Sequence, residues 1–137
     1  MKMSIEHRAI EIARKYFERD HKVDDVTRRK RGMKNRGGYD LQVLRKTSKA
    51  GFWKVEVKGS AHPWGIPDLY GTEVEDKKGN RKLVADFLFV VYFVHGRRPI
   101  CCKIPRRAIK SSLLIPKLGY RIRSTFKKEK ILRKFLV

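Results

Sequence analysis

Two segments of alternating polar and apolar residues, 38–43 and 53–58, most constrain how this chain can fold. A β-strand sends alternate side chains to opposite faces of its sheet. The apolar residues of each segment therefore share one face: Tyr39, Leu41 and Val43 in the first segment, and Trp53, Val55 and Val57 in the second. The polar stretch 45–51 between the segments is typical of a turn. We therefore predict a hairpin on whose opposite, exposed face Asp40, Glu56 and Lys58 converge.

These three side chains suit metal-assisted hydrolysis of a phosphodiester. Two carboxylates can hold a hard divalent cation such as Mg²⁺. A neighbouring ammonium can orient a water molecule or stabilise charge that develops on a phosphate. The alternative is a solvated strand face, because Glu-x-Lys is a common pattern in a chain this rich in lysine.

Charge identifies the class of partner. The chain has 137 residues, which predicts one domain over 1–137 with an ordinary core. Its 35 Lys and Arg against 14 Asp and Glu give a formal charge of +21, which predicts a polyanionic partner, most simply nucleic acid. We expect no membrane partner, because the longest apolar run, 87–94, is far shorter than the roughly 20 residues that span a bilayer.

The ends of the chain and its cysteines bear on location. Residues 1–8 have no apolar signal-peptide core. Cys101 and Cys102 are adjacent, which suits neither a metal knuckle nor a structural disulfide. We expect two buried or half-buried thiols in a protein of the reducing cytoplasm.

Periodicity predicts the other elements. A helix capped by Ser4 should run to about Arg19, with Glu6 inside its apolar sector, where the carboxylate either needs a partner or complements the helix dipole. A short strand or turn is expected at 21–26, a turn at 76–80, and another strand at 99–104. The apolar run 83–94 predicts one long central strand covered by helices, with Asp86 either a structural acceptor or a distant member of the carboxylate cluster. A last amphipathic helix should begin at Ser124 or Thr125 and pack on the domain.

Two loops are candidates for contact with nucleic acid. The first is basic and supplies Arg28, Arg29, Lys30, Arg31, Lys34 and Arg36, which we expect to grip phosphates. The second, 59–68, is rich in Gly and Pro and carries Trp64. This tryptophan either stacks on an unpaired base or, as the more ordinary case, fills the hydrophobic core under the loop.

The order of these elements resembles the restriction-endonuclease-like nucleases, the PD-(D/E)xK superfamily. Gly38-Tyr39-Asp40 and Val55-Glu56-Val57-Lys58-Gly59 look like the central motif of that superfamily, and Glu6 is similar in placement to the first-helix acid of many members. The resemblance covers roughly residues 5–94. It implies an α/β fold in which helices flank a mixed sheet of four to five strands. It also implies Mg²⁺ or Mn²⁺ bound by Asp40 and Glu56, with Lys58 beside the attacking water.

Within the superfamily, the chain is similar both to small archaeal Holliday-junction resolvases, which are short, basic and self-associating, and to uncharacterised restriction-type members. The first function expected is therefore a metal-dependent endonuclease that cuts DNA, in which Glu6 orients a second metal or the water. The alternative is a nuclease-like module that binds nucleic acid without cutting it. A third class, an RNA-associated protein, is allowed by the charge alone. A homodimer is expected if both strands of a duplex are cut.

Overall fold

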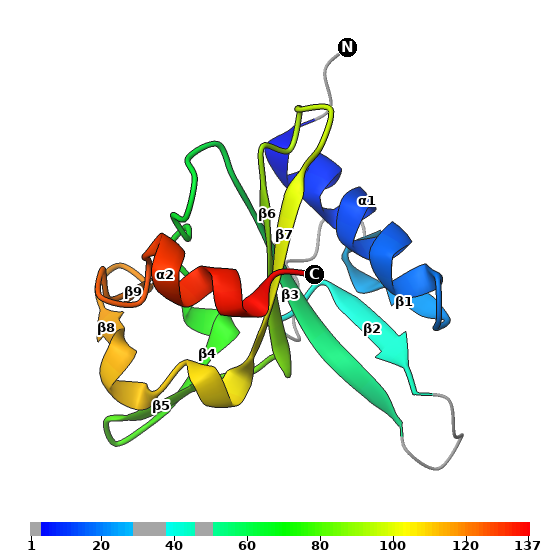
Figure 1. The fold of residues 1–137 in the computed structure, drawn as a ribbon. Coiled ribbons are helices and arrows are strands. Elements are labelled where there is room, and N and C mark those ends of the chain that lie inside the picture. Colours follow the sequence, from blue (N-terminus) through cyan, green and yellow to red (C-terminus); the bar gives the residue numbers. More distant parts are fainter. Residues whose placement is uncertain (1–3, 29–37, 46–50) are drawn as a thin grey trace.

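The computed structural model describes residues 4–28, 38–45 and 51–137, with only the backbone at Arg28 (Figure 1). Its centre is a five-stranded sheet in the order β1-β2-β3-β6-β7. These strands are β1 (Val23–Asp25), β2 (Leu41–Leu44), β3 (Phe52–Ser60), β6 (Phe87–Tyr92) and β7 (Ile100–Pro105). Only β3 and β6 pair in parallel; the other neighbours are antiparallel. The predicted α/β fold with a mixed sheet is therefore confirmed, as is the hairpin of β2 and β3.

One face of the sheet is covered by α1 (Ile5–Glu18), which lies along it in Figure 1. Ser4 caps this helix as predicted, since its side chain accepts a hydrogen bond from the His7 backbone N–H at 3.1 Å. The helix contributes Ala9, Ile10, Ala13 and Phe17 to a core with Leu41, Val43, Val55, Val57, Phe89 and Val91. Amphipathic periodicity therefore accounts for this half of the molecule.

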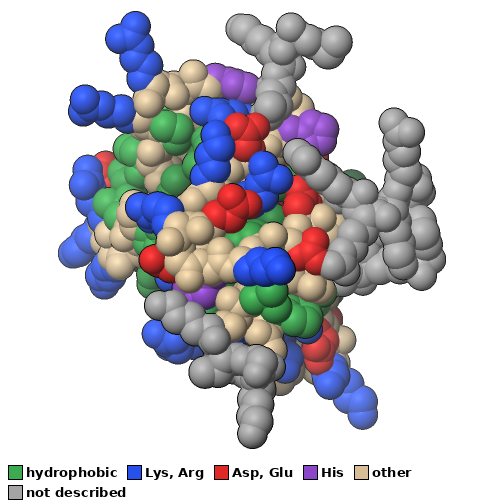
Figure 2. Space-filling model, turned by 90° about the vertical axis from the view of Figure 1, so that its right-hand side faces the viewer, with side chains coloured by type: hydrophobic (Ala, Val, Ile, Leu, Met, Phe, Trp, Pro, Cys, Tyr) green, Lys and Arg blue, Asp and Glu red, His purple; other side chains and the backbone are tan. Residues whose placement is uncertain are grey.

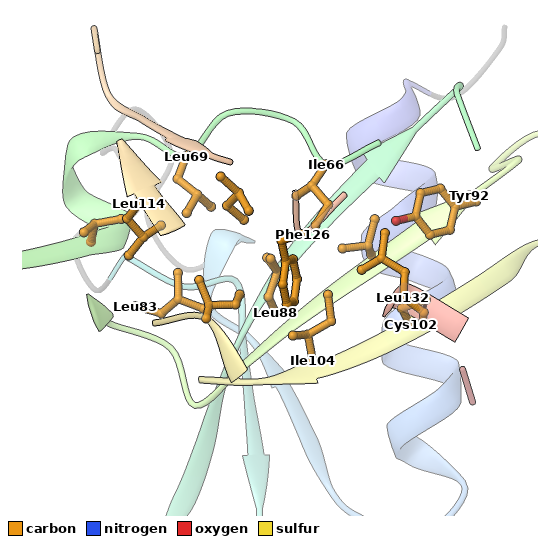
Figure 3. Close-up of a cluster of buried hydrophobic side chains, with 14 residues drawn as sticks. Ile66, Leu69, Leu83, Leu88, Tyr92, Cys102, Ile104, Leu114, Phe126 and Leu132 are labelled. Atoms are coloured by element: carbon orange, nitrogen blue, oxygen red, sulfur yellow. Dashed lines mark hydrogen bonds between the residues drawn. The ribbon is translucent and has the colours of Figure 1, made fainter. Parts of the chain in front are cut away.

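The opposite face is covered by short elements, which gather on the far side of the sheet from α1 (Figure 1). They are the hairpin of β4 (Val74–Lys77) and β5 (Asn80–Leu83), the hairpin of β8 (Leu114–Pro116) and β9 (Tyr120–Ile122), and α2 (Glu129–Leu132), with single 3₁₀ turns between them. They enclose a second core (Figure 3) around Leu69, Leu88, Ile104, Phe126 and Leu132. The expectation of flanking helices is confirmed, although on this face the helix α2 is short and hairpins supply much of the cover.

Two predicted elements are shorter than expected. The run 83–94 is not one strand: Leu83 ends β5, the chain bends, and β6 spans Phe87–Tyr92, ending before Phe93 with its positive φ of 56°. The bend lets Leu83 close the second core while β6 stays central in the sheet. The last helix begins at Glu129 rather than at Ser124 or Thr125, because residues 124–127 form turns that bury Phe126 instead.

The expectations for three local elements and for the two cysteines are confirmed. The short strand at 21–26 is β1, the strand at 99–104 is β7, and the turn at 76–80 joins β4 to β5. Cys101 is half-buried and Cys102 is buried, and both are unpaired thiols. No helix among the described residues is long and apolar enough to cross a membrane.

Candidate active site

The hairpin brings Asp40 next to Glu56, as the alternating pattern predicts. Leu41 is paired with Val55, so Asp40 lies one step further along, beside Glu56. The backbone N–H of Asp40 donates to the Val55 carbonyl at 2.8 Å. The Asp40 carboxylate in turn accepts the Val57 backbone N–H at 2.8 Å. The position of this carboxylate is therefore fixed by the strand pairing itself.

The expectation that this face is exposed is wrong. Asp40, Glu56 and Lys58 are only 6%, 3% and 9% exposed. The loop between β3 and β4 returns over the polar face of the hairpin and covers these side chains. Buried ionisable groups require charge partners or a change of protonation. A solvated strand face, the ordinary alternative, is thereby excluded.

A third acid, Glu73, belongs to the same cluster and was not predicted. It lies in a 3₁₀ turn (Gly71–Glu73) just before β4 and is 7% exposed. Its Oε1 lies 2.9 Å from the Nζ of Lys58, whereas the Oε1 of Glu56 is 3.7 Å from the same nitrogen. Glu73 Oε1 also accepts the Tyr70 backbone N–H at 2.8 Å. Glu73 therefore ties the covering turn to Lys58.

Glycine at position 38 allows the turn to approach this closely. Gly38 has a φ of +70°, and a Cβ added there would lie 2.0 Å from the Thr72 carbonyl oxygen. Any other residue would both strain the backbone and push the turn away. Gly38 lies two residues before Asp40, so the entry to β2 and the turn that carries Glu73 pack directly on each other.

The start of α1 completes the surroundings of the acids. A cavity of about 880 Å³ is lined by Ile5, Glu6, Gly38, Asp40, Glu56, Val57, Lys58, Gly59, Pro67, Asp68, Tyr70, Gly71, Thr72 and Glu73. A Cβ on Gly59 would lie 2.7 Å from the Cγ2 of Ile5, so glycine there lets the helix approach the strand. Glu6 is exposed and lines the cavity. Its place in the apolar sector of the helix indicated a side chain that points into the core, but the Glu6 side chain lies at the surface instead.

Protonation in the cluster follows from burial and crowding. Burial raises the pKa of Asp40 to about 6, although the Val57 N–H acts against this shift. Burial, then the charges of Asp40 and Glu73, raise the pKa of Glu56 far above its ordinary value. Burial alone would lower the pKa of Lys58, but Glu56 and Glu73 outweigh it and the net shift is upward. The cluster therefore holds a charged lysine among more acids than it can neutralise.

The chemistry of these donors fits a divalent cation. The Oε2 of Glu56 is buried and accepts no hydrogen bond from the described residues, which is costly unless another group binds it. Within residues 4–28, 38–45 and 51–137, no three His, Cys, Asp or Glu side chains are arranged to surround a metal ion. Mg²⁺ does not need three, since it is commonly held by one or two carboxylates with waters and substrate phosphates. Asp40 and Glu56 can supply that pair.

Asp86 is a structural hydrogen-bond acceptor and not a distant member of the carboxylate cluster, which decides between the two predictions for it. Its carboxylate accepts the Lys54 backbone N–H at 2.8 Å and the Arg106 guanidinium at 2.8 Å. It lies at the start of β6, where it joins β3 to the end of β7. Asp86 is not among the residues that line the cavity.

Trp64 packs against the hydrophobic core under its loop, which was the more ordinary of the two predictions for it. Its ring lies 5.5 Å from that of Tyr92, between ring centroids, and the Arg133 guanidinium lies 5.3 Å from its centroid. Trp64 is half-buried against the second core, so the structure does not support it as a free surface for base stacking. The loop that we predicted to bind phosphates lies outside the described residues. This holds for the side chain of Arg28 and for Arg29, Lys30, Arg31, Lys34 and Arg36.

Tyr39 also departs from its predicted face. Its hydroxyl accepts a hydrogen bond from Gln42 at 2.9 Å, and the Lys54 Nζ lies 5.7 Å from its ring centroid. Both partners belong to the polar face. The hydrogen bond from Asp40 N–H to the Val55 carbonyl extends the strand pairing to Asp40. Tyr39 lies beyond it, so strand alternation does not apply to Tyr39.

Sequence signals for Glu73 were weak. The position shows no periodicity, and it falls in the long loop between two predicted strands. The only local signal is the spacing of three residues between Tyr70 and Glu73, at which an acid can reach back to a backbone N–H at the start of a turn. That spacing predicts the turn but not its contact with Lys58.

No protein-family model, no curated protein and no solved structure matches this chain. The resemblance to the restriction-endonuclease-like nucleases therefore rests on the motif residues and on the order of the elements.

Proposed function

We propose that this chain is a metal-dependent endonuclease that hydrolyses DNA phosphodiester bonds. One observation carries the proposal: Asp40, Glu56 and Lys58 are buried side by side in a cavity, with one acid oxygen left without a partner. Buried ionisable groups in such excess are expensive for a fold. Perturbed ionisable groups in a cavity are typical of functional sites.

Asp40 and Glu56 would hold Mg²⁺ or Mn²⁺, which supplies Lewis-acid stabilisation and lowers the pKa of a bound water. Lys58 stays protonated because Glu56 and Glu73 raise its pKa. Its ammonium can then stabilise the negative charge that grows on the phosphate during in-line attack. Glu73 fixes the direction of the ammonium, and Glu6 at the cavity wall can orient a water molecule.

The surface charge fits a DNA partner. On the face drawn in Figure 2, Lys and Arg side chains project at the left edge, and others lie among several acidic side chains nearer the middle. The formal charge of +21 favours contact with phosphates of any sequence. Because one site cuts one strand, cleavage of a duplex would need two copies, and we propose self-association on DNA. The unpaired thiols fit a cytoplasmic location.

The test combines metal binding with cleavage. Calorimetry should show Mn²⁺ binding to the wild type that is lost in Asp40→Asn and in Glu56→Gln but kept in Asp86→Asn, the matched control on the same strand pair. With Mg²⁺ or Mn²⁺, the wild type should cut branched, nicked, duplex or single-stranded DNA. If no divalent metal supports cleavage of any of these, the endonuclease proposal is refuted.

The second candidate is a nuclease-like module that binds nucleic acid, DNA or RNA, without cutting it. The formal charge of +21 supports this candidate, because it favours binding to nucleic acid whether or not the strand is cut. It predicts tight, salt-sensitive binding that is unchanged in Glu56→Gln, together with no cleavage. Comparing DNA with RNA in the same assays separates an RNA-associated role.

A further inference from the structure

A second, smaller cavity of about 290 Å³ opens beside β9. It is lined by Ile115, Arg121, Arg123, Ser124, Thr125 and Lys127. Its volume is near the lower end of the roughly 300–1,000 Å³ that small ligands occupy. The lining contains three cations and two hydroxyl groups but no acid, so its chemistry is that of an anion site.

Arg123 is held in place without being neutralised, and Lys127 has no acid partner among the described residues. Arg123 donates through Nε to the Ser112 carbonyl at 2.7 Å, which orients the guanidinium while leaving its charge uncompensated. Lys127 is half-buried, and no carboxylate of the described residues forms an ion pair with it. Such cations, next to hydroxyl groups, form strong charge-assisted hydrogen bonds with phosphate oxygens.

The third cation joins this cavity to the candidate active site. Arg121 faces Asp68 at 3.9 Å, with both side chains about half exposed, so the pair is weak. Asp68 itself lines the larger cavity. Between the two cavities, Leu69 and Tyr120 exchange backbone hydrogen bonds of 2.8 Å in both directions. This bridge and the Arg121–Asp68 pair therefore connect the walls of the two cavities.

We propose that the basic cavity binds a backbone phosphate of the nucleic-acid strand whose neighbouring phosphodiester lies at Asp40, Glu56 and Lys58. The inference rests on the proposed function and gives it a substrate contact. The large cavity is rich in acids, which repel a polyanion unless a cation is bound there. A strand therefore needs a positive anchor close by, and Arg123 and Lys127 provide it. A single strand that follows both cavities is the substrate this geometry favours.

The test compares two variants that remove the same charge. Arg121→Gln/Lys127→Gln alters the cavity, whereas Lys15→Gln/Lys22→Gln removes two exposed lysines from the opposite side of the sheet. Binding of a short fluorescent single-stranded DNA is measured by anisotropy in EDTA over a range of salt. The cavity variant should lose about tenfold more affinity than the control. Its slope of log K against log salt should fall by about 0.7 for the lost phosphate.

A single Lys127→Gln variant, with thermal melting as the check on folding, should lose affinity in the same direction. Equal losses in the cavity and control variants would overturn the inference, because net charge alone would then explain binding. The two proposals fail separately. A wild type that cuts DNA, with a cavity variant that binds like the control, refutes only the basic cavity. A wild type that cuts nothing, with a cavity variant that binds weakly, refutes only the nuclease.

Discussion

Two acids that contact β3 or lie in it, the half-buried Asp86 and the buried Glu56, have opposite surroundings. Asp86, at the start of β6, accepts one backbone N–H and one guanidinium, and so has a donor for each carboxylate oxygen. Glu56, inside β3, shares one lysine with Glu73, lies beside Asp40 and keeps one oxygen without a donor. A fold can use the first acid for stability. The second weakens the fold unless something else binds there, and this contrast is what distinguishes a candidate active site from a structural ion pair.

The largest effect is expected from Lys58→Ala, which removes the cation that Glu56 and Glu73 share. If Lys58 stabilises charge in the transition state, single-turnover cleavage should fall by roughly 10²–10³-fold, the range seen when one such donor is removed. Binding of DNA in EDTA should change little, because the side chain acts on the rate.

The matched control for that prediction is Lys54→Ala. Lys54 lies on the same strand face, four residues earlier, but packs on Tyr39 instead of the acids. Cleavage should stay near the wild-type rate in this variant. Equal cleavage by Lys58→Ala and Lys54→Ala would remove Lys58 from the mechanism.

Stability should change in opposite directions at the two acids. In EDTA at pH 7, Glu56→Gln should raise the free energy of unfolding by about 1–3 kcal/mol, since the amide avoids the cost of protonating a carboxyl that is ionised in the unfolded chain. Asp86→Ala should lower it by a similar amount, because it leaves a backbone N–H and Arg106 without their acceptor. Urea denaturation measures both changes. A destabilised Glu56→Gln would mean that Glu56 is as well satisfied as Asp86.

The sequence could predict the part of the site that lies on regular elements. Asp40, Glu56 and Lys58 were predictable because period-two alternation fixes their common face. The helix α1 was equally predictable from its 3.6-residue period. Their burial was not, because it depends on a turn whose docking requires Gly38 and Glu73, residues far apart in the sequence that show no periodicity. The second core, made of hairpins and single turns around Leu69 and Phe126, was missed for the same reason.

Asp40 gives a pH dependence with a defined sign. Its pKa is about 6 in the folded protein against 3.8 ordinarily, so the folded state holds the proton more tightly than the unfolded state. Its contribution to stability is complete below about pH 4 and is lost as the pH rises through 6. The free energy of unfolding of the metal-free wild type should therefore fall by about 2 kcal/mol between pH 4 and 7, relative to that of Asp40→Asn.

Asp76 is the control for that measurement because its pKa is shifted the other way. Its hydrogen bond with Arg81 lowers the pKa of Asp76. The contribution of Asp76 to stability is therefore present at pH values above its ordinary pKa and is lost as the pH falls. Urea denaturation in EDTA at several pH values should show Asp40→Asn and Asp76→Asn diverging from the wild type in opposite directions. Parallel pH profiles for wild type and Asp40→Asn would mean that Asp40 titrates normally.

The smallest effect is expected from Glu73→Gln, which tests what the third acid does. Glutamine can still accept the Tyr70 N–H, so the turn should keep its shape, but the charge facing Lys58 is lost. Without this carboxylate the pKa of Lys58 should fall, and the alkaline limb of the rate profile should move to lower pH. We also expect the single-turnover rate to fall about tenfold, which corresponds to about 1.4 kcal/mol.

Glu75→Gln is the control, because Glu75 lies two residues later and pairs at the surface with Lys77. A purely structural Glu73 would lower thermal stability without moving the pH profile. A shifted profile with an unchanged melting temperature would show that Glu73 acts through Lys58.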